Sequence, residues 1–416
     1  MSFLHLRTLI LPTFIPVSDR GCSNLQPTKL RSRADFAVAF FLFPFKSTPH
    51  SLVYKMMRST QSEREPLLRR ISSNLGAPPM LLQPGVEKLI STATMPEDSA
   101  FPAPKWITRV EHKKQRKMPQ CIAHRGFKAK HPENSMAAFK GAVKAGAHAI
   151  ETDLHVTKDE VVVISHDATL KRCFGRPDKI KDKTWDEIKD LTTTSDPHEP
   201  MPRLLDLLAY LSEPGLKDIW ILLDIKLDND ADQIMRLIAS TIASAPPASN
   251  RKWEDRVVLG IWAAKFLPLA LKYSPGFPVV HIGFSTSYAR HFFQIPDVGF
   301  NMLLPILIGP GGQSFLREAR EKFHRRVIAW TVNTEDRMEW CIRRELDGVI
   351  TDDPEMFLRV CDGFDETARE SWPGMRWGSY WEVWRLWVWV TVAFWWFEKM
   401  FAPIASRSMI VKKVKT

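Results

Sequence analysis

Residues 120–154 read QCIAHRGFKAKHPENSMAAFKGAVKAGAHAIETDL. Two short apolar runs, at residues 120–124 and 149–154, flank a segment at residues 135–145 whose apolar side chains recur at helical spacing. A strand, a helix and a second strand in this order form the repeating unit of parallel α/β folds. This stretch therefore predicts a buried parallel sheet covered by helices.

The same alternation continues to about residue 362. Further strands are expected at residues 161–165, 219–225, 257–262, 279–284, 327–332 and 348–351, and helices at 230–244, 263–273, 314–324 and 335–344. Two details stay open, since residues 161–165 could be the second arm of a hairpin and residues 300–308 could supply another strand. Eight strands alternating with helices over about 250 residues predict a TIM-type (β/α)8 barrel, here over residues 118–362.

Two histidines follow apolar runs at the point where a strand should end. His124 precedes Arg125 and Gly126, and His166 follows the run VVVIS. Active sites of such barrels lie at these strand ends. One histidine alone would more often be an ordinary surface residue, but two imidazoles can act as acid and base near neutral pH. We therefore predict that His124 and His166 form a catalytic pair.

Carboxylates lie two residues apart on two predicted strands. AIETDLHVT places Glu151 and Asp153 on one face, and IWILLDIKL places Asp224 and Lys226 on one face. Buried like charges need a cation or become neutral, and hard divalent cations take oxygen ligands. We predict one divalent cation, Mg²⁺ in preference to Ca²⁺ or Mn²⁺, held by Glu151 and Asp153. Asp224 would complete the site while Lys226 binds phosphate, or the two would form a structural ion pair.

The ordered set of motifs resembles the glycerophosphodiester phosphodiesterase family. The motifs are HRG at His124, PENS at Pro132, ETD at Glu151, SHD at Ser165, LDIK at Leu223, WTVN at Trp330 and GVITDDP at Gly348. They cover nearly all of residues 118–362. The resemblance implies a TIM-barrel phosphodiester hydrolase with His124 and His166 as catalytic pair, Glu151 and Asp153 as metal ligands, and Arg125 and Lys226 as phosphate contacts.

Three further residues of these motifs carry expectations. Asp224 stands where the family usually has glutamate, which puts the third metal ligand in question. Asn134 is expected to cap the helix that starts at Ser135, and Glu133 is more naturally structural than catalytic. Trp330 ends a predicted strand, so we expect it to line the substrate pocket.

The two ends of the chain differ from the barrel. Residues 1–117 are rich in Pro, Ser and Arg and are expected to form a disordered basic extension that includes a candidate targeting segment. Residues 363–416 contain a tryptophan-rich segment whose uncharged run, residues 386–397, is too short to span a bilayer. We expect a monotopic or hairpin anchor with a basic tail that meets anionic headgroups, or alternatively a helix docked on the barrel.

Composition narrows the class of protein. Five scattered cysteines without metal spacing indicate reduced thiols in a domain that faces the cytosol. A serine nucleophile elbow, a Walker loop and a dinucleotide-binding GxGxxG are absent from the sequence. The formal charge of +11 suits an anionic partner, which we take to be a membrane surface rather than nucleic acid, and no obligate protein partner is evident. A lipid droplet, the endoplasmic reticulum or the mitochondrial surface would provide such a membrane.

Within the family the chain is most similar to fungal phosphatidylglycerol phospholipases C, through FKAKHPENS, LDIKLDN, GIWAAKF and ITDDPEMFLRVCDG. The resemblance implies a metal-dependent phospholipase C that releases diacylglycerol and glycerol phosphate from phosphatidylglycerol. A phosphodiesterase for deacylated, soluble glycerophosphodiesters is the alternative of the same class. A catalytically silent, membrane-associated binding protein is the alternative of another class.

Overall fold

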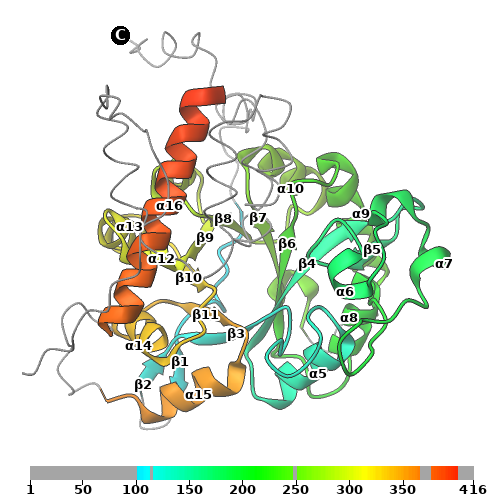
Figure 1. The fold of residues 1–416 in the computed structure, drawn as a ribbon, viewed down its shortest axis with the longest axis horizontal. Helices are drawn as coiled ribbons and strands as arrows, with labels where there is room; N and C mark the ends of the chain where they lie inside the picture. The colour runs from blue at the N-terminus through cyan, green and yellow to red at the C-terminus, as the bar shows by residue number, and fades with distance from the viewer. Residues whose placement is uncertain (1–100, 113–115, 247–250, 366–375, 402–416) are drawn as a thin grey trace, which may run out of the picture. The chain divides into compact units, whose positions relative to one another are not determined.

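The computed structural model describes residues 101–112, 116–246, 251–365 and 376–401, so predictions on residues 1–100 and on the basic tail fall outside it. In this part of the chain eight parallel strands form a closed ring with helices outside (Figure 1). The strands are β3 (Gln120–His124), β4 (Ala149–Val156), β6 (Trp220–Ile225), β7 (Val257–Ile261), β8 (Val279–Gly283), β9 (Gly299–Leu303), β10 (Val327–Trp330) and β11 (Gly348–Thr351). The first strand, β3, pairs with both β4 and β11, which closes the ring. The predicted TIM-type barrel is confirmed.

Both open details of the strand prediction are resolved. β5 (Val162–Ile164) pairs antiparallel with β4, so it is a hairpin arm and does not belong to the ring. The eighth strand is β9, which ends at Leu303 where α12 (Leu304–Ile308) begins with Pro305 in its first turn. Proline suits the first turn of a helix, since its missing N–H would have no helical partner there.

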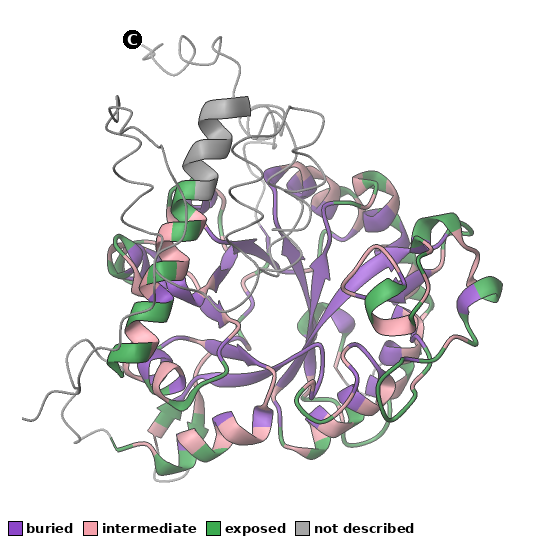
Figure 2. Cartoon of the chain, in the orientation of Figure 1, coloured by how far each residue is buried: buried purple, intermediate pink, exposed green. Residues whose placement is uncertain are grey.

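Helices follow most strands. They are α5 (Met136–Lys144), α6 (Lys171–Phe174), α7 (Trp185–Ile188), α8 (Leu204–Leu211), α9 (Ala231–Ser244), α10 (Leu267–Tyr273), α11 (Thr286–His291), α13 (Gly312–Arg317), α14 (Glu335–Arg343), α15 (Pro354–Gly363) and α16 (Trp377–Phe401). Short turns η3 (Ile180–Asp182), η4 (Trp253–Asp255), η5 (Ala264–Phe266), η6 (Phe292–Gln294) and η7 (Glu318–Lys322) complete the set. Figure 2 shows the strands buried and the outer sides of the helices exposed.

Apolar side chains fill both sides of the ring. Those that point inward form one cluster, which includes Ile122, Leu222, Val258, Val280 and Ile328. A second, larger cluster lies between the strands and the surrounding helices. Because both faces of each strand are buried, the runs read as continuously apolar in the sequence. The polar residues inside these runs are therefore exceptional.

Residues 101–112 close the amino-terminal end of the barrel. Ile107 is fully buried in the inner cluster, and Phe101 is buried in the outer one. Gln120 donates from Nε2 to the carbonyls of Trp106, at 2.5 Å, and Thr108, at 2.9 Å. β1 (Val110–His112) pairs antiparallel with β2 (Arg116–Met118). The expectation of disorder up to residue 117 is therefore wrong for this stretch, because its few apolar side chains cover the open barrel end.

The tryptophan-rich segment forms α16, which packs on the barrel through one side. Val383 of α16 is buried in the outer cluster. Gly309, at the end of α12, has no room for a Cβ atom beside the ring of Trp387. Arg337 of α14 donates to Ser379 Oγ at 3.0 Å and to Glu382 Oε2 at 2.7 Å. None of the helices in the described part of the chain combines the length and hydropathy needed to cross a bilayer.

Candidate active site

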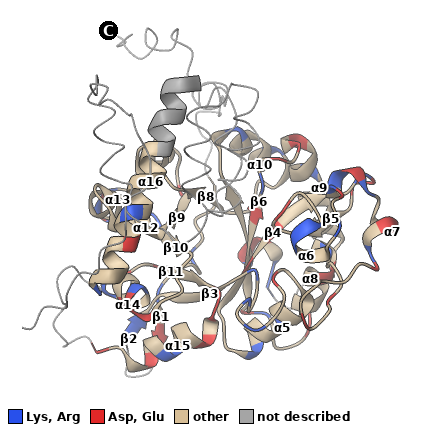
Figure 3. Ribbon diagram, viewed as in Figure 1, with Lys and Arg blue, Asp and Glu red and all other residues tan. Residues whose placement is uncertain are grey.

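The strand register brings the predicted site residues together. His124 on β3 pairs with Glu151 on β4, and Asp153 on β4 pairs with Asp224 on β6. All of these strands are parallel, so their carboxyl ends meet at one end of the barrel. Figure 3 shows acidic residues, in red, beside the labels β4 and β6 near the centre of the ring. The site therefore arises from neighbouring strand ends.

Three buried carboxylates form the centre of the site. Each of Glu151, Asp153 and Asp224 offers an oxygen, and these atoms lie within 4.8 Å of one another. Burial, reinforced by the charges of Asp153 and Asp224, raises the pKa of Glu151 well above its ordinary value. Crowded carboxylates of this kind suit a hard divalent cation, which takes oxygen ligands and removes the repulsion. The predicted ligand set thus fits a metal ion, and its chemistry does not identify which one.

Lys226 lies against the same carboxylates. Its Nζ is 2.6 Å from Asp153 Oδ1 and 2.6 Å from Asp224 Oδ2. The other oxygen of Asp224 accepts a hydrogen bond of 2.6 Å from Trp262 Nε1. Asp224 therefore belongs to the carboxylate cluster and also forms the ion pair with Lys226, while its role as a metal ligand stays a prediction. An ammonium group has three donors, which leaves one N–H of Lys226 for a phosphate oxygen.

The turn after β3 places Arg125 beside the cluster. Arg125 adopts a left-handed backbone conformation with φ 56°, and its N–H donates to Glu151 Oε2 at 3.0 Å. Its Nε lies 3.2 Å from Asp153 Oδ2. The next residue, Gly126, has φ 81°, and a Cβ atom there would collide with Ala138. The glycine of the HRG motif is thus required for the turn that positions Arg125.

His124 has a carboxylate partner that the sequence did not identify. Its Nδ1 lies 2.6 Å from Asp352 Oδ1, and Asn333 donates to Asp352 Oδ2 at 2.8 Å. Burial and the charge of Arg125 lower the pKa of His124, against the opposing effect of Asp352. With Nδ1 held by a carboxylate, Nε2 is the nitrogen that can exchange a proton with substrate. Asn333 belongs to the WTVN motif and Asp352 to the GVITDDP motif, although the spacing along the chain does not show that they lie beside His124.

His166 is held in the same manner. Its Nδ1 lies 2.8 Å from Oδ1 of Asp167, the next residue in the chain. Burial and the charge of Lys226 lower the pKa of His166 to about 4. Both histidines therefore favour the neutral imidazole, whose free Nε2 can accept a proton, and the one that acts as the acid must first take up a proton.

The PENS motif serves the site differently from our expectation. Ser135, and not Asn134, caps α5, with its Oγ accepting from Ala138 N at 3.1 Å. Asn134 has φ 56°, which turns its side chain inward, where Nδ2 donates to Asp153 Oδ2 at 2.8 Å. Glu133 is bound by two arginines that hold its pKa at about 2 against the effect of burial. So acidic a group is a poor proton donor near neutral pH.

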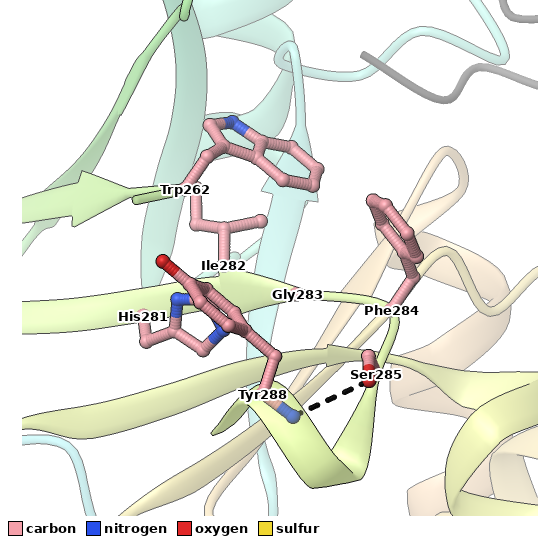
Figure 4. Close-up of a pocket in the computed structure, with 7 residues that line it drawn as sticks. All are labelled: Trp262, His281, Ile282, Gly283, Phe284, Ser285 and Tyr288. Carbon is pink, nitrogen blue, oxygen red and sulfur yellow. Dashed lines mark hydrogen bonds between the residues drawn. The ribbon is translucent and has the colours of Figure 1, made fainter. Parts of the chain in front are cut away.

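Aromatic residues occupy the opposite side of the same barrel end. Trp262, Phe284 and Trp330 lie at the ends of β7, β8 and β10. The ring of Trp262 lies 5.6 Å from that of Trp330 and 6.4 Å from that of Phe284, measured between centroids. Figure 4 shows Trp262 and Phe284 beside a small pocket that His281 also lines. Trp330 packs against the ring of Trp262 and donates to the carbonyl oxygen of Asn301 at 3.1 Å, and its contact with substrate stays a prediction.

Comparison with known proteins agrees with this arrangement. Residues 124–356 match the model of the glycerophosphoryl diester phosphodiesterase family. A glycerophosphodiester phosphodiesterase from Caldanaerobacter subterraneus is 30% identical over 256 residues, which are 58% of this chain and 96% of that protein. The human lysophospholipase D GDPD1 is 47% identical over 78 residues, 19% of this chain and 25% of that protein.

The fold also matches a solved structure, that of an Oleispira antarctica phosphodiesterase in complex with the product sn-glycerol-3-phosphate. The TM-score is 0.51 at 19% identity, over 59% of this chain and 98% of the other. The chain therefore belongs to the glycerophosphoryl diester phosphodiesterase family and is a phosphodiester hydrolase.

Proposed function

We propose that this enzyme is a phospholipase C that cleaves phosphatidylglycerol into diacylglycerol and glycerol phosphate. The observation that carries the proposal is the position of Trp262. Its Nε1 donates to Asp224, while its ring packs against Phe284 and Trp330. Trp262 is itself buried, and it joins the carboxylate cluster to an aromatic cluster whose partly exposed member is Trp330. A phospholipid offers a phosphate to the first cluster and hydrocarbon to the exposed part of the second, whereas a deacylated glycerophosphodiester offers only the phosphate.

The residues of the site can perform the cleavage as two proton transfers. A divalent cation held by Glu151, Asp153 and Asp224 would supply charge neutralisation and acidify a hydroxyl group. Arg125 and Lys226 lie beside these carboxylates and would neutralise charge on the phosphate. One imidazole, of His124 or His166, accepts the proton of the attacking oxygen at Nε2, and the other, in its protonated form, donates its Nε2 proton to the diacylglycerol oxygen as the bond of that oxygen to phosphorus breaks.

Phosphatidylglycerol carries its own nucleophile. The headgroup hydroxyl next to the phosphate ester can attack phosphorus within the same molecule, and such proximity is worth about 7 to 11 kcal/mol in well-oriented cases. The first products would be diacylglycerol and a cyclic glycerol phosphate, which water opens in a second step. Phosphatidylcholine lacks this hydroxyl and should be a poor substrate.

The outer side of α16 supports a membrane as the source of substrate. Trp377, Trp381, Trp389 and Val392 are the exposed large apolar residues of the described part of the chain, at 50%, 51%, 39% and 54% exposure. Their spacings of four, eight and three residues place them on one side of the helix, roughly opposite Val383, which is buried. Tryptophan prefers the membrane interface, and Arg385, exposed on the same side, suits anionic headgroups. We infer that this stripe rests on an anionic membrane that faces the cytosol.

Deacylated glycerophosphodiesters are the second candidate substrate. The Caldanaerobacter relative, which this chain covers over 96% of its length, has the name of an enzyme for that class. A silent binding protein is disfavoured, because both histidines and three carboxylates lie together with partners that orient them.

The test is an incubation of the purified full chain with phosphatidylglycerol, phosphatidylinositol or glycerophosphocholine, followed by product identification. We expect diacylglycerol and glycerol phosphate from phosphatidylglycerol. A phosphatidylglycerol analogue with hydrogen in place of the adjacent headgroup hydroxyl should react far more slowly. Preferred cleavage of glycerophosphocholine would support the second candidate. Phosphatidic acid as the lipid product would place the cleavage on the other side of phosphorus and refute a phospholipase C.

A further inference from the structure

An arginine outside the predicted site joins the two loops that carry the catalytic groups. Arg172 lies on α6, in the segment that follows His166. Its Nε donates to Asp167 Oδ2 at 2.7 Å. Its two terminal nitrogens donate to both oxygens of Glu133, at 2.8 Å and 2.7 Å. The guanidinium of Arg172 therefore binds two carboxylates, those of Asp167 and Glu133, which belong to different loops.

Both carboxylates also contact residues of the predicted active site. Asp167 contacts His166 Nδ1 through its other oxygen, at 2.8 Å. Glu133 also accepts from Arg125 Nη1 at 2.8 Å, and Arg125 Nε lies 3.2 Å from Asp153. A continuous chain of charged groups thus runs from His166 through Arg172 to the carboxylate cluster.

We propose that Arg172 is a positioning residue that holds the imidazole of His166 in register with Arg125 and the carboxylate cluster. Arg172 fixes which oxygen of Asp167 faces His166, because it occupies the other one. Fixing the carboxylate fixes the tautomer and direction of the imidazole that it holds. This role of Arg172 concerns the orientation of the acid and base groups. The proposal therefore does not depend on which phosphodiester is the substrate.

The exposure of Arg172 separates this role from a purely structural one. Its side chain is 47% exposed, whereas that of Glu133 is 9% exposed. When Arg172 is lost, the buried carboxylate of Glu133 keeps its ion pair with Arg125, so no buried charge is left unpaired and the fold should stay largely intact. The paired geometry, with two parallel N–H donors on one carboxylate, is specific to arginine, and lysine cannot reproduce it.

The experiment compares Arg172→Ala with Arg172→Lys and a matched control. Arg176→Ala is the control, because Arg176 lies in the same segment, is 39% exposed and pairs with Asp178, away from the site. Residues that orient a functional histidine from behind typically contribute about 10- to 100-fold to activity. We expect kcat of Arg172→Ala to fall by about that factor with little change in KM, since Arg172 does not reach the substrate. Arg172→Lys should lie between this variant and the wild type, and Arg176→Ala should match the wild type.

Two further readouts distinguish positioning from folding. Added guanidinium ion should restore part of the kcat of Arg172→Ala, because it can occupy the gap between the two carboxylates. Asp167→Asn combined with Arg172→Ala should be no slower than Asp167→Asn alone, since both changes release the same imidazole. Wild-type kcat in Arg172→Ala, or multiplicative losses in the double variant, would overturn the proposal. If Arg172→Ala unfolds at the assay temperature, Arg172→Gln replaces it, and the same two outcomes decide.

Discussion

Replacing Asp352 by asparagine tests the orientation of His124 with the smallest change of shape. In the structure one oxygen of Asp352 lies 2.6 Å from His124 Nδ1. The other oxygen accepts from Asn333 Nδ2 at 2.8 Å and from Lys128 Nζ at 3.4 Å. Burial raises the pKa of Asp352, but the hydrogen bond with His124 and the nearby positive charges outweigh it and bring the pKa to about 2. Asp352 is therefore an acceptor throughout the neutral range.

The amide of Asp352→Asn changes which nitrogen of His124 carries the proton. An asparagine NH₂ group facing Nδ1 favours the tautomer with the proton on Nε2, which then cannot accept one from substrate. The same exchange in the serine protease triad costs about 10⁴ in kcat, and general acid or base catalysis as a whole contributes about 10² to 10⁴. We expect a loss of about 10² to 10⁴ in kcat. The effect on folding should be about 1 kcal/mol, since one hydrogen bond changes.

The assay is steady-state cleavage of phosphatidylglycerol at saturating metal, with thermal unfolding of each protein measured in parallel. Asp353→Asn is the matched control, because the same chemical change one residue later affects a helix cap, where Asp353 Oδ1 accepts from Met356 N at 2.9 Å. That variant should keep kcat and lose well under about 1 kcal/mol of stability, because asparagine caps a helix about as well as aspartate does. If Asp352→Asn kept kcat within a factor of about three, or if both variants lost it equally, Asp352 would have no role in orienting His124.

Three further outcomes are expected. Asp224→Asn should raise the metal concentration for half activity more than it changes KM at saturating metal, and an unchanged metal requirement would leave Asp224 only as the ion-pair partner of Lys226. Burial lowers the pKa of His281 to about 3 while the unfolded chain takes up its proton near pH 6.5, so this residue costs stability as the pH falls through that window, about 3 kcal/mol by pH 4.5. In urea unfolding at pH 7 and pH 4.5, the free energy of unfolding should fall less between the two pH values for His281→Gln than for the wild type. Equal losses in the two proteins would assign the pH effect to other groups. Serine at three exposed tryptophans of α16 should abolish sedimentation with phosphatidylglycerol vesicles, and undiminished binding would refute the membrane contact of this stripe; the residues are Trp377, Trp381 and Trp389.

The site residues whose position is set by a single strand were predictable from the sequence. His124, Glu151, Asp153 and Asp224 interrupt apolar runs, and a period of two assigns them to the inner face of a barrel. The closed barrel followed from the alternation of strands and helices, although the hairpin arm β5 differs from a ring strand only in its pairing direction. The hydrophobic pattern of a strand shows which of its side chains face the core, because that pattern results from the burial of the same strand.

Partners that meet through the tertiary fold were not predictable in this way. Asp352 and His124 are separated by 228 positions, and only the pairing of β11 with β3 brings them together. Arg172 reads as an ordinary exposed residue in a loop. Asn134 and Ser135 are both good helix caps, and the choice between them depends on the inward turn of Asn134 toward Asp153. Composition likewise could not show that Ile107 covers the end of the barrel.

The closure of the ring has a consequence for the timing of activity during protein synthesis. Translation delivers His124, the carboxylates and His166 early, while Asp352 is part of the segment directly after the last strand, β11. A nascent chain that has emerged up to β10 therefore holds every ligand of the predicted metal site and both imidazoles, but His124 has no carboxylate behind it. The pair of His124 and Asp352 forms only when the last strand docks beside the first. An incomplete chain thus lacks the oriented His124 that we expect the cleavage of a phosphodiester to need.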